Sequence, residues 1–289
     1  MKAKIVNAFT DLIYGGNPAG VVTDFLNFSD NQMIEISKKL AVSETAFLFP
    51  SNNADYKLRF FSPEMEVDLC GHATIATFFH LAEKKEFDNS KDKISVSQQT
   101  NTGILPIEIH FKNDRVLKVM MTQKPLRVID IELDYKNIAE SLGIQENKII
   151  KSIPKQIIST GLFTLPIEID SFETLKKLKP NFNKIKKICL EKKCGSFHIF
   201  SFDSIENNSK YHARNFAPVY GICEDPVTGT ANGAVSSFLF KNRLIHEKKF
   251  ICEQGDIIGR PGRIHIELEK DTVKVGGKAK FVKEINIKV

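Results

Sequence analysis

The hydrophobic and polar positions along the chain predict many short strands and only a few helices. Apolar residues alternate with polar ones, or form short runs that end at turn-forming residues, in segments that are typical of strands. Strands are expected at residues 45–49, 104–111, 116–122, 155–160, 197–202 and 263–269. Apolar residues at helical spacing predict helices at residues 29–42, 72–85, 135–142, 176–193 and 230–242. Hairpin-length links between strands favour an α+β protein with a mainly antiparallel sheet over a doubly wound parallel one.

Two of the expected helices carry local signals of their own. Ser29 can cap the first helix while Gln32, three residues later, completes a capping box. The segment Lys176–Lys193 holds eight lysines, and Pro180 divides it into two short helices with apolar residues on one side. We interpret these lysines as a solvated face.

A sequence repeat relates the two halves of the chain. The pattern R-x-F-[SA]-P occurs at Arg59–Pro63 and again at Arg214–Pro218, and each copy precedes a glycine that opens a helix rich in small residues. The repeat predicts two similar domains, each with one helix that a sheet can wrap closely. If the halves pack around a pseudo-two-fold axis, both helix N-termini can face one cleft and hold a small anion such as a carboxylate; two independent helix starts remain the alternative.

Composition excludes several classes of protein. With 42% hydrophobic and 26% charged residues among 289, the chain is globular rather than disordered or collagen-like. Its five cysteines are an odd and sparse set, which favours reduced thiols. No second ligand pair accompanies Cys189, Cys194 and His198, so no metal site is expected. Because the sequence shows neither the pattern of a membrane span nor that of a signal peptide, we expect a cytoplasmic protein.

The net charge of +6 does not indicate a nucleic-acid partner, because the lysines are not interleaved with aromatic residues and no nucleic-acid-binding module is present. No membrane partner is expected either. The glycine-rich stretch at residues 15–20 lacks the strand and helix that flank a nucleotide-binding loop. We therefore expect no cofactor and a small molecule as the ligand.

Three side chains are candidates for chemistry. Glu44 lies where a helix ends and an apolar strand begins, and a partly desolvated carboxylate there suits general acid/base catalysis; a solvated loop glutamate is the plainer interpretation. His72, at the start of the next helix, is either a polar cap or a proton-transfer partner. Cys70 is either a nucleophile at a helix N-terminus or a small buried residue, and its repeat mate is Thr228.

Four motifs together resemble the phenazine-biosynthesis PhzF-like isomerase/epimerase family. They occur in the family's order across nearly the whole chain, at residues 16–22, 43–47, 59–74 and 224–231. The resemblance implies two domains of the diaminopimelate-epimerase type, related by a pseudo-two-fold, each a curved, mainly antiparallel sheet around a central helix. It also implies an active site between the domains and a homodimer. The expected domains are residues 1–115, to which a strand at about 279–289 can return, and residues 116–278.

The resemblance also implies roles for individual residues. Those with expected catalytic roles are Glu44, His72 and Asp225. Those expected to bind the substrate are Asn17, Gly71, Gly229 and Thr230. Thr230 stands where the family's D-P-x-T-G-S signature usually has serine, so it keeps the hydroxyl and adds a methyl group that can narrow the pocket.

Taken together, these expectations predict an enzyme that transfers a proton on a small carboxylate-bearing substrate without a cofactor. Glu44 is the expected acid/base, and the lack of a second thiol at Thr228 favours one-base isomerisation. An amino-acid epimerase or racemase that uses Cys70 as one base is the alternative. A catalytically silent small-molecule-binding protein on the same fold is another, because a fold alone does not establish turnover.

Overall fold

The computed structural model describes residues 1–24 and 27–288, which form two compact units. Unit 1 comprises Met1–Thr122 and the described part of Gly276–Val289, and unit 2 comprises Gln123–Val275. The sequence analysis places the boundary after residue 115. The chain instead leaves unit 1 after Thr122 because the strand that ends there pairs with the preceding strand. Residue 289, at the end of the expected returning strand, lies outside the described residues.

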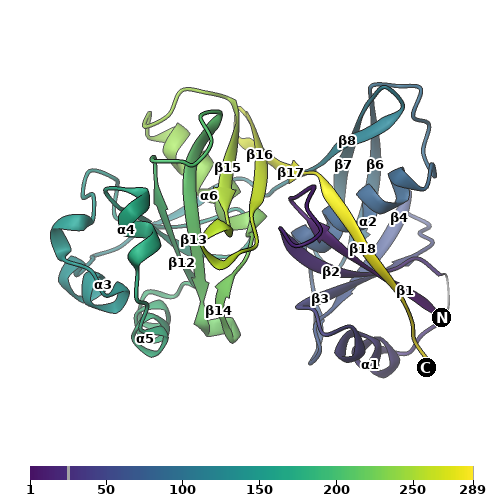
Figure 1. The fold of residues 1–289 in the computed structure, drawn as a ribbon, viewed down its shortest axis with the longest axis horizontal. Coiled ribbons are helices and arrows are strands. Elements are labelled where there is room, and N and C mark those ends of the chain that lie inside the picture. Colours follow the sequence, from purple (N-terminus) through teal and green to yellow (C-terminus); the bar gives the residue numbers. More distant parts are fainter. Residues whose placement is uncertain (25–26, 289) are drawn as a thin grey trace. The chain divides into compact units, whose positions relative to one another are not determined.

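Unit 1 contains strands from both ends of the chain. Its strands are β1 (Lys2–Ala8), β2 (Asn17–Val22), β3 (Glu44–Phe49), β4 (Tyr56–Phe61), β5 (Glu66–Val67), β6 (Lys93–Thr100), β7 (Gly103–Lys112), β8 (Arg115–Thr122) and β18 (Ala279–Asn286). Its helices are α1 (Asp30–Leu40) and α2 (Gly71–Glu83). Figure 1 shows β18, in yellow, alongside β1, in purple.

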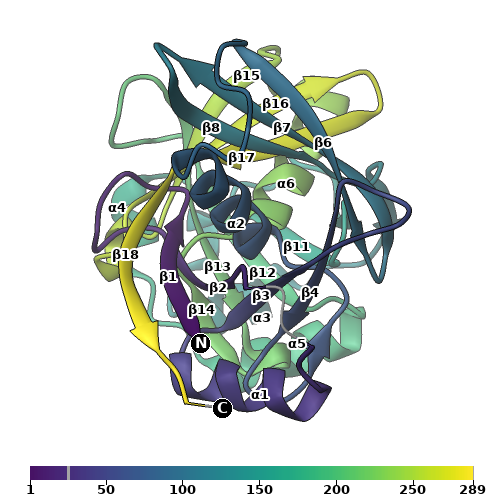
Figure 2. The same cartoon turned by 90° about the vertical axis from the view of Figure 1, so that its right-hand side faces the viewer.

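The sheet of unit 1 surrounds α2. Its strands pair in the order β18-β1-β2-β3-β4-β6-β7-β8, with β5 on β4; the β2–β3 and β4–β6 pairs are parallel and the others antiparallel. Figure 2 shows α2 inside the curve of these strands. Ala73 and Ala76 of α2 are fully buried, and every residue from Ala73 to Ala82 is buried. A helix that is buried all round needs apolar contacts on every side, and the curved sheet provides them.

Unit 2 contains more helix than unit 1. Its strands are β9 (Arg127–Asp130), β10 (Gln156–Ser159), β11 (Thr164–Glu168), β12 (Ser196–Ser201), β13 (Ser209–Ala217), β14 (Ile222–Asp225), β15 (Lys249–Gln254) and β16 (Gly262–Glu269), and β17 (Thr272–Gly277) leads back to unit 1. Its α-helices are α3 (Tyr135–Leu142), α4 (Phe172–Lys177), α5 (Phe182–Lys192) and α6 (Gly229–Lys241). Short 3₁₀ turns are η1 (Glu146–Lys148), η2 (Pro218–Tyr220) and η3 (Asp256–Ile258).

The strands of unit 2 pair in the same pattern as those of unit 1. The order is β9-β10-β11-β12-β13-β15-β16, with β14 on β13; the β11–β12 and β13–β15 pairs are parallel and the others antiparallel. Along the chain, α6 follows the short strand β14 and precedes β15, just as α2 follows the short strand β5 and precedes β6. The α+β fold of two similar units is confirmed.

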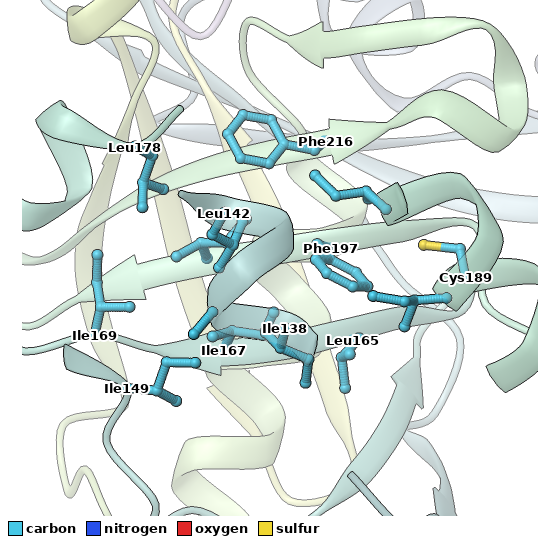
Figure 3. Packing of buried hydrophobic residues seen from close by; sticks show 14 of the residues in the cluster. Ile138, Leu142, Ile149, Leu165, Ile167, Ile169, Leu178, Cys189, Phe197 and Phe216 are labelled. Atoms are coloured by element: carbon cyan, nitrogen blue, oxygen red, sulfur yellow. The ribbon is translucent and has the colours of Figure 1, made fainter. Parts of the chain in front are cut away.

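A hydrophobic core joins α3 and α5 to the sheet of unit 2. Leu142 of α3, Cys189 of α5 and Leu165 of β11 pack with Phe197 and Phe216, as Figure 3 shows. Because side chains alternate along a strand, Phe197 faces this core while its neighbour His198 points to the other face of the sheet. There Nδ1 of His198 lies 3.2 Å from Oδ1 of Asn215 on the adjacent strand β13.

The sequence repeat corresponds to the same ion pair in each unit. Arg59 binds Glu66 through two hydrogen bonds of 2.8 and 2.7 Å, and Arg214 binds Glu224 through two of the same lengths. Each guanidinium also lies over a phenylalanine ring two residues later in the chain, at 5.0 and 4.9 Å from the ring centroid. These bidentate hydrogen bonds raise the pKa of Arg59 and lower that of Glu66.

The expected helices are confirmed, with small differences at their ends. The capping box of Ser29 and Gln32 is present, but α1 ends at Leu40 because Ala41 takes the left-handed conformation (φ 53°). Two helices are separated around Pro180, as predicted, but the first, α4, starts at Phe172 and shares only Lys176 and Lys177 with the lysine-rich segment. The sequence analysis missed several strands, among them β1, β2, β13 and β15. Within the part of the chain that the structure describes, every helix is too short or too polar to span a membrane.

Candidate active site

Glu44 is positioned by the connection from α1 to β3. The chain turns back at Ala41, and Glu44 pairs with Ala19 of β2 in parallel register. Phe47 packs in the core with Met33 of α1. Since β3 side chains alternate, Glu44 lies on the opposite face of the sheet from Phe47, the face toward α2.

The first turn of α2 brings Cys70 and His72 together. Cys70 is the extended N-cap residue (φ −136°, ψ 112°), and its side chain makes no capping hydrogen bond. Its Sγ lies 3.4 Å from Nδ1 and 3.8 Å from Nε2 of His72. The first turn carries no acidic residue, so its backbone N–H groups, with those of Gly71 and His72 among them, favour an anion at this helix end.

Glu44, Cys70 and His72 form one cluster. Oε2 of Glu44 lies 3.4 Å from Nε2 of His72, and the side chains are 21% and 12% exposed, respectively. The nearest ligand atoms of all three residues lie within 4.8 Å of one another. A carboxylate, an imidazole and a thiol therefore lie at the N-terminus of α2, partly shielded from water. Of the two sequence interpretations of His72, its position beside a carboxylate favours a proton-transfer partner over a polar cap.

Ser43 is a member of this cluster that the sequence analysis did not single out. Its Oγ lies 3.5 Å from Nε2 of His72. The only signal in the sequence is its position directly before Glu44. A serine at this position does not by itself predict a contact with His72, which lies 29 residues later in the chain.

Asn17 begins β2 and lies two residues before Ala19, the partner of Glu44. It is 2% exposed. The preceding Gly16 has a positive φ of 64°, and a Cβ atom there would lie 2.1 Å from the carbonyl oxygen of Ala8. Only glycine fits this close approach, which sets the start of β2.

In unit 2, Asp225 and Thr228 lie directly before α6. Asp225 ends β14 and pairs with Asn215 of β13, and its Oδ2 accepts a short hydrogen bond from the hydroxyl of Thr228. Thr228 is the N-cap residue of α6, as Cys70 is of α2. This hydroxyl–carboxylate pair occupies the place that a second thiol would need.

Gln254, which the sequence analysis missed, holds this loop in place. Its Nε2 donates to the carbonyl oxygen of Asp225 (2.9 Å) and to Oγ1 of Thr228 (3.1 Å). Its Oε1 accepts from the backbone N–H of Thr228 (3.1 Å) and from Nδ2 of Asn232 (2.7 Å). Gln254 is the last residue of β15, at least 26 residues after the loop that it contacts, so no local sequence pattern could have indicated it.

Gly229 and Thr230 form the first turn of α6. The hydroxyl of Thr160 donates to the carbonyl oxygen of Thr230 at 3.2 Å. A Cβ atom on Gly161 would lie 2.8 Å from the Cγ2 methyl carbon of Thr230. The extra methyl group, relative to the family's serine, therefore packs against Gly161.

The counterpart of Glu44 in unit 2 carries no carboxylate. Ser196 begins β12 and pairs with Thr164 of β11 as Glu44 pairs with Ala19. His198 further along β12 is fully buried, and this burial lowers its pKa to about 4. A single carboxylate therefore occupies this strand position in the two units.

The structure thus gathers the expected site residues into a group within each unit. Glu44, Gly71, His72 and Cys70 meet in unit 1, with Asn17 on the neighbouring strand. In unit 2, Asp225 is hydrogen-bonded to Thr228, the residue that directly precedes Gly229 and Thr230. Glu44, Cys70 and His72 are also the one group of three potential metal ligands found within residues 1–24 and 27–288.

Comparisons with known proteins agree with this architecture. An uncharacterized isomerase from Clostridium acetobutylicum is 37% identical over 96% of this chain and 94% of the relative. An uncharacterized isomerase from Bacillus subtilis is 35% identical over 91% of this chain and 89% of the relative. The crystal structure of a PhzF-family phenazine biosynthesis protein from Bacillus anthracis covers 100% of this chain and 99% of its own, with a TM-score of 0.91 and 28% identity.

The family model for phenazine biosynthesis-like proteins, PhzC-PhzF, matches residues 6–284. This range includes all four motifs of the sequence analysis and the strands and helices that carry both groups of site residues. The resemblance inferred from the motifs is confirmed. The chain belongs to the PhzC-PhzF family of phenazine biosynthesis-like proteins.

Proposed function

We propose that this isomerase moves a proton on a small carboxylate-bearing substrate, without a cofactor, and that Glu44 is its general acid/base. The observation that carries the proposal is the 3.4 Å separation between Oε2 of Glu44 and Nε2 of His72 at the N-terminus of α2. This position combines a base with a helix end that favours anions.

The substrate carboxylate is proposed to bind at the backbone N–H groups of Gly71 and His72. The partial positive charge of the helix end holds it there, close to the side chain of Glu44. Bound in this way, the substrate presents a carbon-bound proton to Glu44. Glu44 removes that proton and returns it to another carbon or to the other face of the same carbon.

His72 is proposed to orient the Glu44 carboxylate and to stabilise negative charge that develops on the substrate. A donated hydrogen bond from the imidazole to either group has this effect. The hydroxyl of Ser43, 3.5 Å from Nε2, helps to hold the imidazole. Asn17 is proposed to contribute to substrate binding from β2.

A single base favours isomerisation over two-base racemisation. The positions in unit 2 that correspond to Glu44 and Cys70 hold Ser196 and Thr228, neither of which is a base at neutral pH. We also propose a catalytic role for Asp225 and substrate-binding roles for Gly229 and Thr230. Substitution of each residue tests them.

An epimerase or racemase that uses Cys70 is the second candidate. Its support is the 3.4 Å separation between Sγ of Cys70 and Nδ1 of His72, since an adjacent imidazole can accept a thiol proton and generate a thiolate. Substitution of Cys70 distinguishes this candidate from the first.

Hydrogen exchange with solvent tests the proposed function. The protein is incubated in D₂O with a panel of small unsaturated and amino carboxylic acids, and products and recovered substrates are examined by NMR and mass spectrometry. We expect conversion with deuterium at a carbon position, loss of conversion in Glu44→Gln, and full conversion in the surface control Glu35→Gln. Added chelator should not lower the activity. Carboxylate binding with no conversion across the panel would instead favour a silent binding protein.

A further inference from the structure

We propose that Glu44, Cys70 and His72 form a binding site for Zn²⁺, and that zinc bound there inhibits the protein. The three side chains offer a carboxylate oxygen, a thiolate sulfur and an imidazole nitrogen, which are the ligands that zinc prefers. They come from the first residue of β3 and the first turn of α2. The binding itself does not depend on the proposed function, whereas the inhibition does.

The distances between the ligand atoms fit a tetrahedral ion. With usual zinc bond lengths, two ligand atoms of a tetrahedral site lie about 3.4–3.6 Å apart. Nε2 of His72 lies 3.4 Å from Oε2 of Glu44 and 3.8 Å from Sγ of Cys70. All three ligand atoms lie within 4.8 Å of one another. Sγ lies nearer to Nδ1 of His72 (3.4 Å) than to Nε2, so the side chains of Cys70 and His72 must rotate before the thiol and Nε2 can bind one ion.

The ligand chemistry selects among metal ions. Mg²⁺ and Ca²⁺ require oxygen ligands, so a site with one sulfur and one nitrogen excludes them. Zinc and its spectroscopic substitute Co²⁺ accept all three ligand types. With three ligands from the protein, a fourth position stays open to water.

Burial and charge also favour this ion. Cys70 is 7% exposed, and the side chains of His72 and Glu44 are 12% and 21% exposed, so an ion can enter from solvent into a partly desolvated site. When zinc binds, a sulfur–zinc bond replaces the sulfur–hydrogen bond of Cys70 and the proton is released to water. The thiolate and carboxylate together balance the charge of the ion.

Inhibition follows from the oxygen that zinc would occupy. The carboxylate of Glu44 is the group proposed to accept the substrate proton, and a carboxylate bound to zinc is a much weaker base. The ion also blocks the N-terminus of α2. Zinc should therefore inhibit turnover, and a chelator should restore it.

The experiment uses Co²⁺ and Zn²⁺ with the reduced protein under anaerobic conditions. Cobalt should produce the near-ultraviolet absorption of a thiolate-to-metal charge transfer, and zinc should displace it. Competition with a chromophoric chelator then gives the zinc affinity. Cys70→Ser should abolish the charge-transfer band. It should also weaken zinc binding by at least ~10–100-fold, because losing a group that only hydrogen-bonds to a metal ligand already weakens metal binding by that factor. Cys223→Ser, which removes the exposed cysteine, should change neither.

Several outcomes would overturn the inference. Equal zinc affinity in the wild type and Cys70→Ser, or loss of the cobalt band in Cys223→Ser, would place the metal elsewhere. Glu44→Gln provides a second variant: it should keep the sulfur band and weaken zinc binding, and unchanged affinity would remove Glu44 from the site. If zinc binds at these residues without inhibiting, the role of Glu44 as the base fails while the metal site stands. If no zinc binds and turnover depends on Glu44, only the metal site fails.

Discussion

The imidazole of His72 lies beside the carboxylate of Glu44, with 3.4 Å between Nε2 and Oε2. Strands β4 and β5 separate the two residues along the chain, so the contact depends on the packing of α2 against β3. It places the expected acid/base at a helix N-terminus.

Removing the carboxylate should abolish most of the activity. Glu44→Gln keeps the shape of the side chain but cannot accept a proton, and we expect kcat to fall about 10²–10⁴-fold, the usual contribution of a positioned acid/base. Cys70→Ala should keep most of the activity, because one-base chemistry gives the thiol no role. Steady-state kinetics on a substrate found in the D₂O screen measure both. A comparable loss in Cys70→Ala would favour the thiol-based epimerase.

The repeated arginines should differ in their contribution to stability. Arg214→Lys loses a bidentate pair with Glu224 whose side chains are 8% and 14% exposed, so we expect it to lower the free energy of unfolding by about 1.5–3 kcal/mol. Arg59→Lys should cost less, because that side chain is 21% exposed. The chain has no tryptophan, so urea unfolding is best followed by circular dichroism. A larger loss in Arg59→Lys would contradict the argument from burial.

Gln254 should position the start of α6. Gln254→Leu removes the acceptor of the Thr228 backbone N–H and of one of the two N–H groups of the Asn232 amide, and each such buried donor costs about 1–3 kcal/mol. Gln254→Glu keeps the acceptor oxygen and should destabilise less. Thermal unfolding compares the two variants. Equal loss in both would show that the donated hydrogen bonds to Asp225 and Thr228 dominate instead.

Buried His198 should make stability depend on pH. Burial lowers its pKa from 6.5 to about 4. Between these values the unfolded chain binds a proton that the folded protein does not, so the free energy of unfolding falls as pH drops from 6.5 to 4 and then levels off. The full effect is about 3 kcal/mol.

His198→Gln isolates this contribution because glutamine does not titrate. Urea unfolding of both proteins at several pH values should show a smaller loss between pH 6.5 and 4 in the variant. Parallel curves would mean that His198 is protonated in the folded protein as easily as in the unfolded chain.

Much of the fold was predictable because its signals are local. The capping box at Ser29 and the break at Pro180 depend on residues close in the chain, and both are confirmed. The missed strands β13 and β15 contain polar residues that are buried in unit 2. His212 and Glu253 illustrate the reason: both side chains are fully buried, with 3.0 Å between Nδ1 and Oε2. Such a pair is invisible to a hydrophobic pattern until the strands that carry it are adjacent.

Within the candidate site, the motifs identified the residues but not their contacts. Glu44, Cys70 and His72 were singled out from sequence, yet their mutual distances follow only from the strand alternation that places Glu44 on the α2 face. Ser43 and Gln254 had no comparable signal. Both act through side-chain contacts with residues distant in sequence.

The amino-acid sequence by itself determined the α+β class, the internal repeat and the family, because periodicity and motifs are properties of neighbouring residues. The tertiary structure decided which groups meet. It set the thiol and imidazole of the α2 N-terminus beside Glu44, and it placed Ser196 at the matching position of unit 2. Those outcomes depend on strand register and helix packing, which arise from contacts across the whole unit and which no short segment specifies.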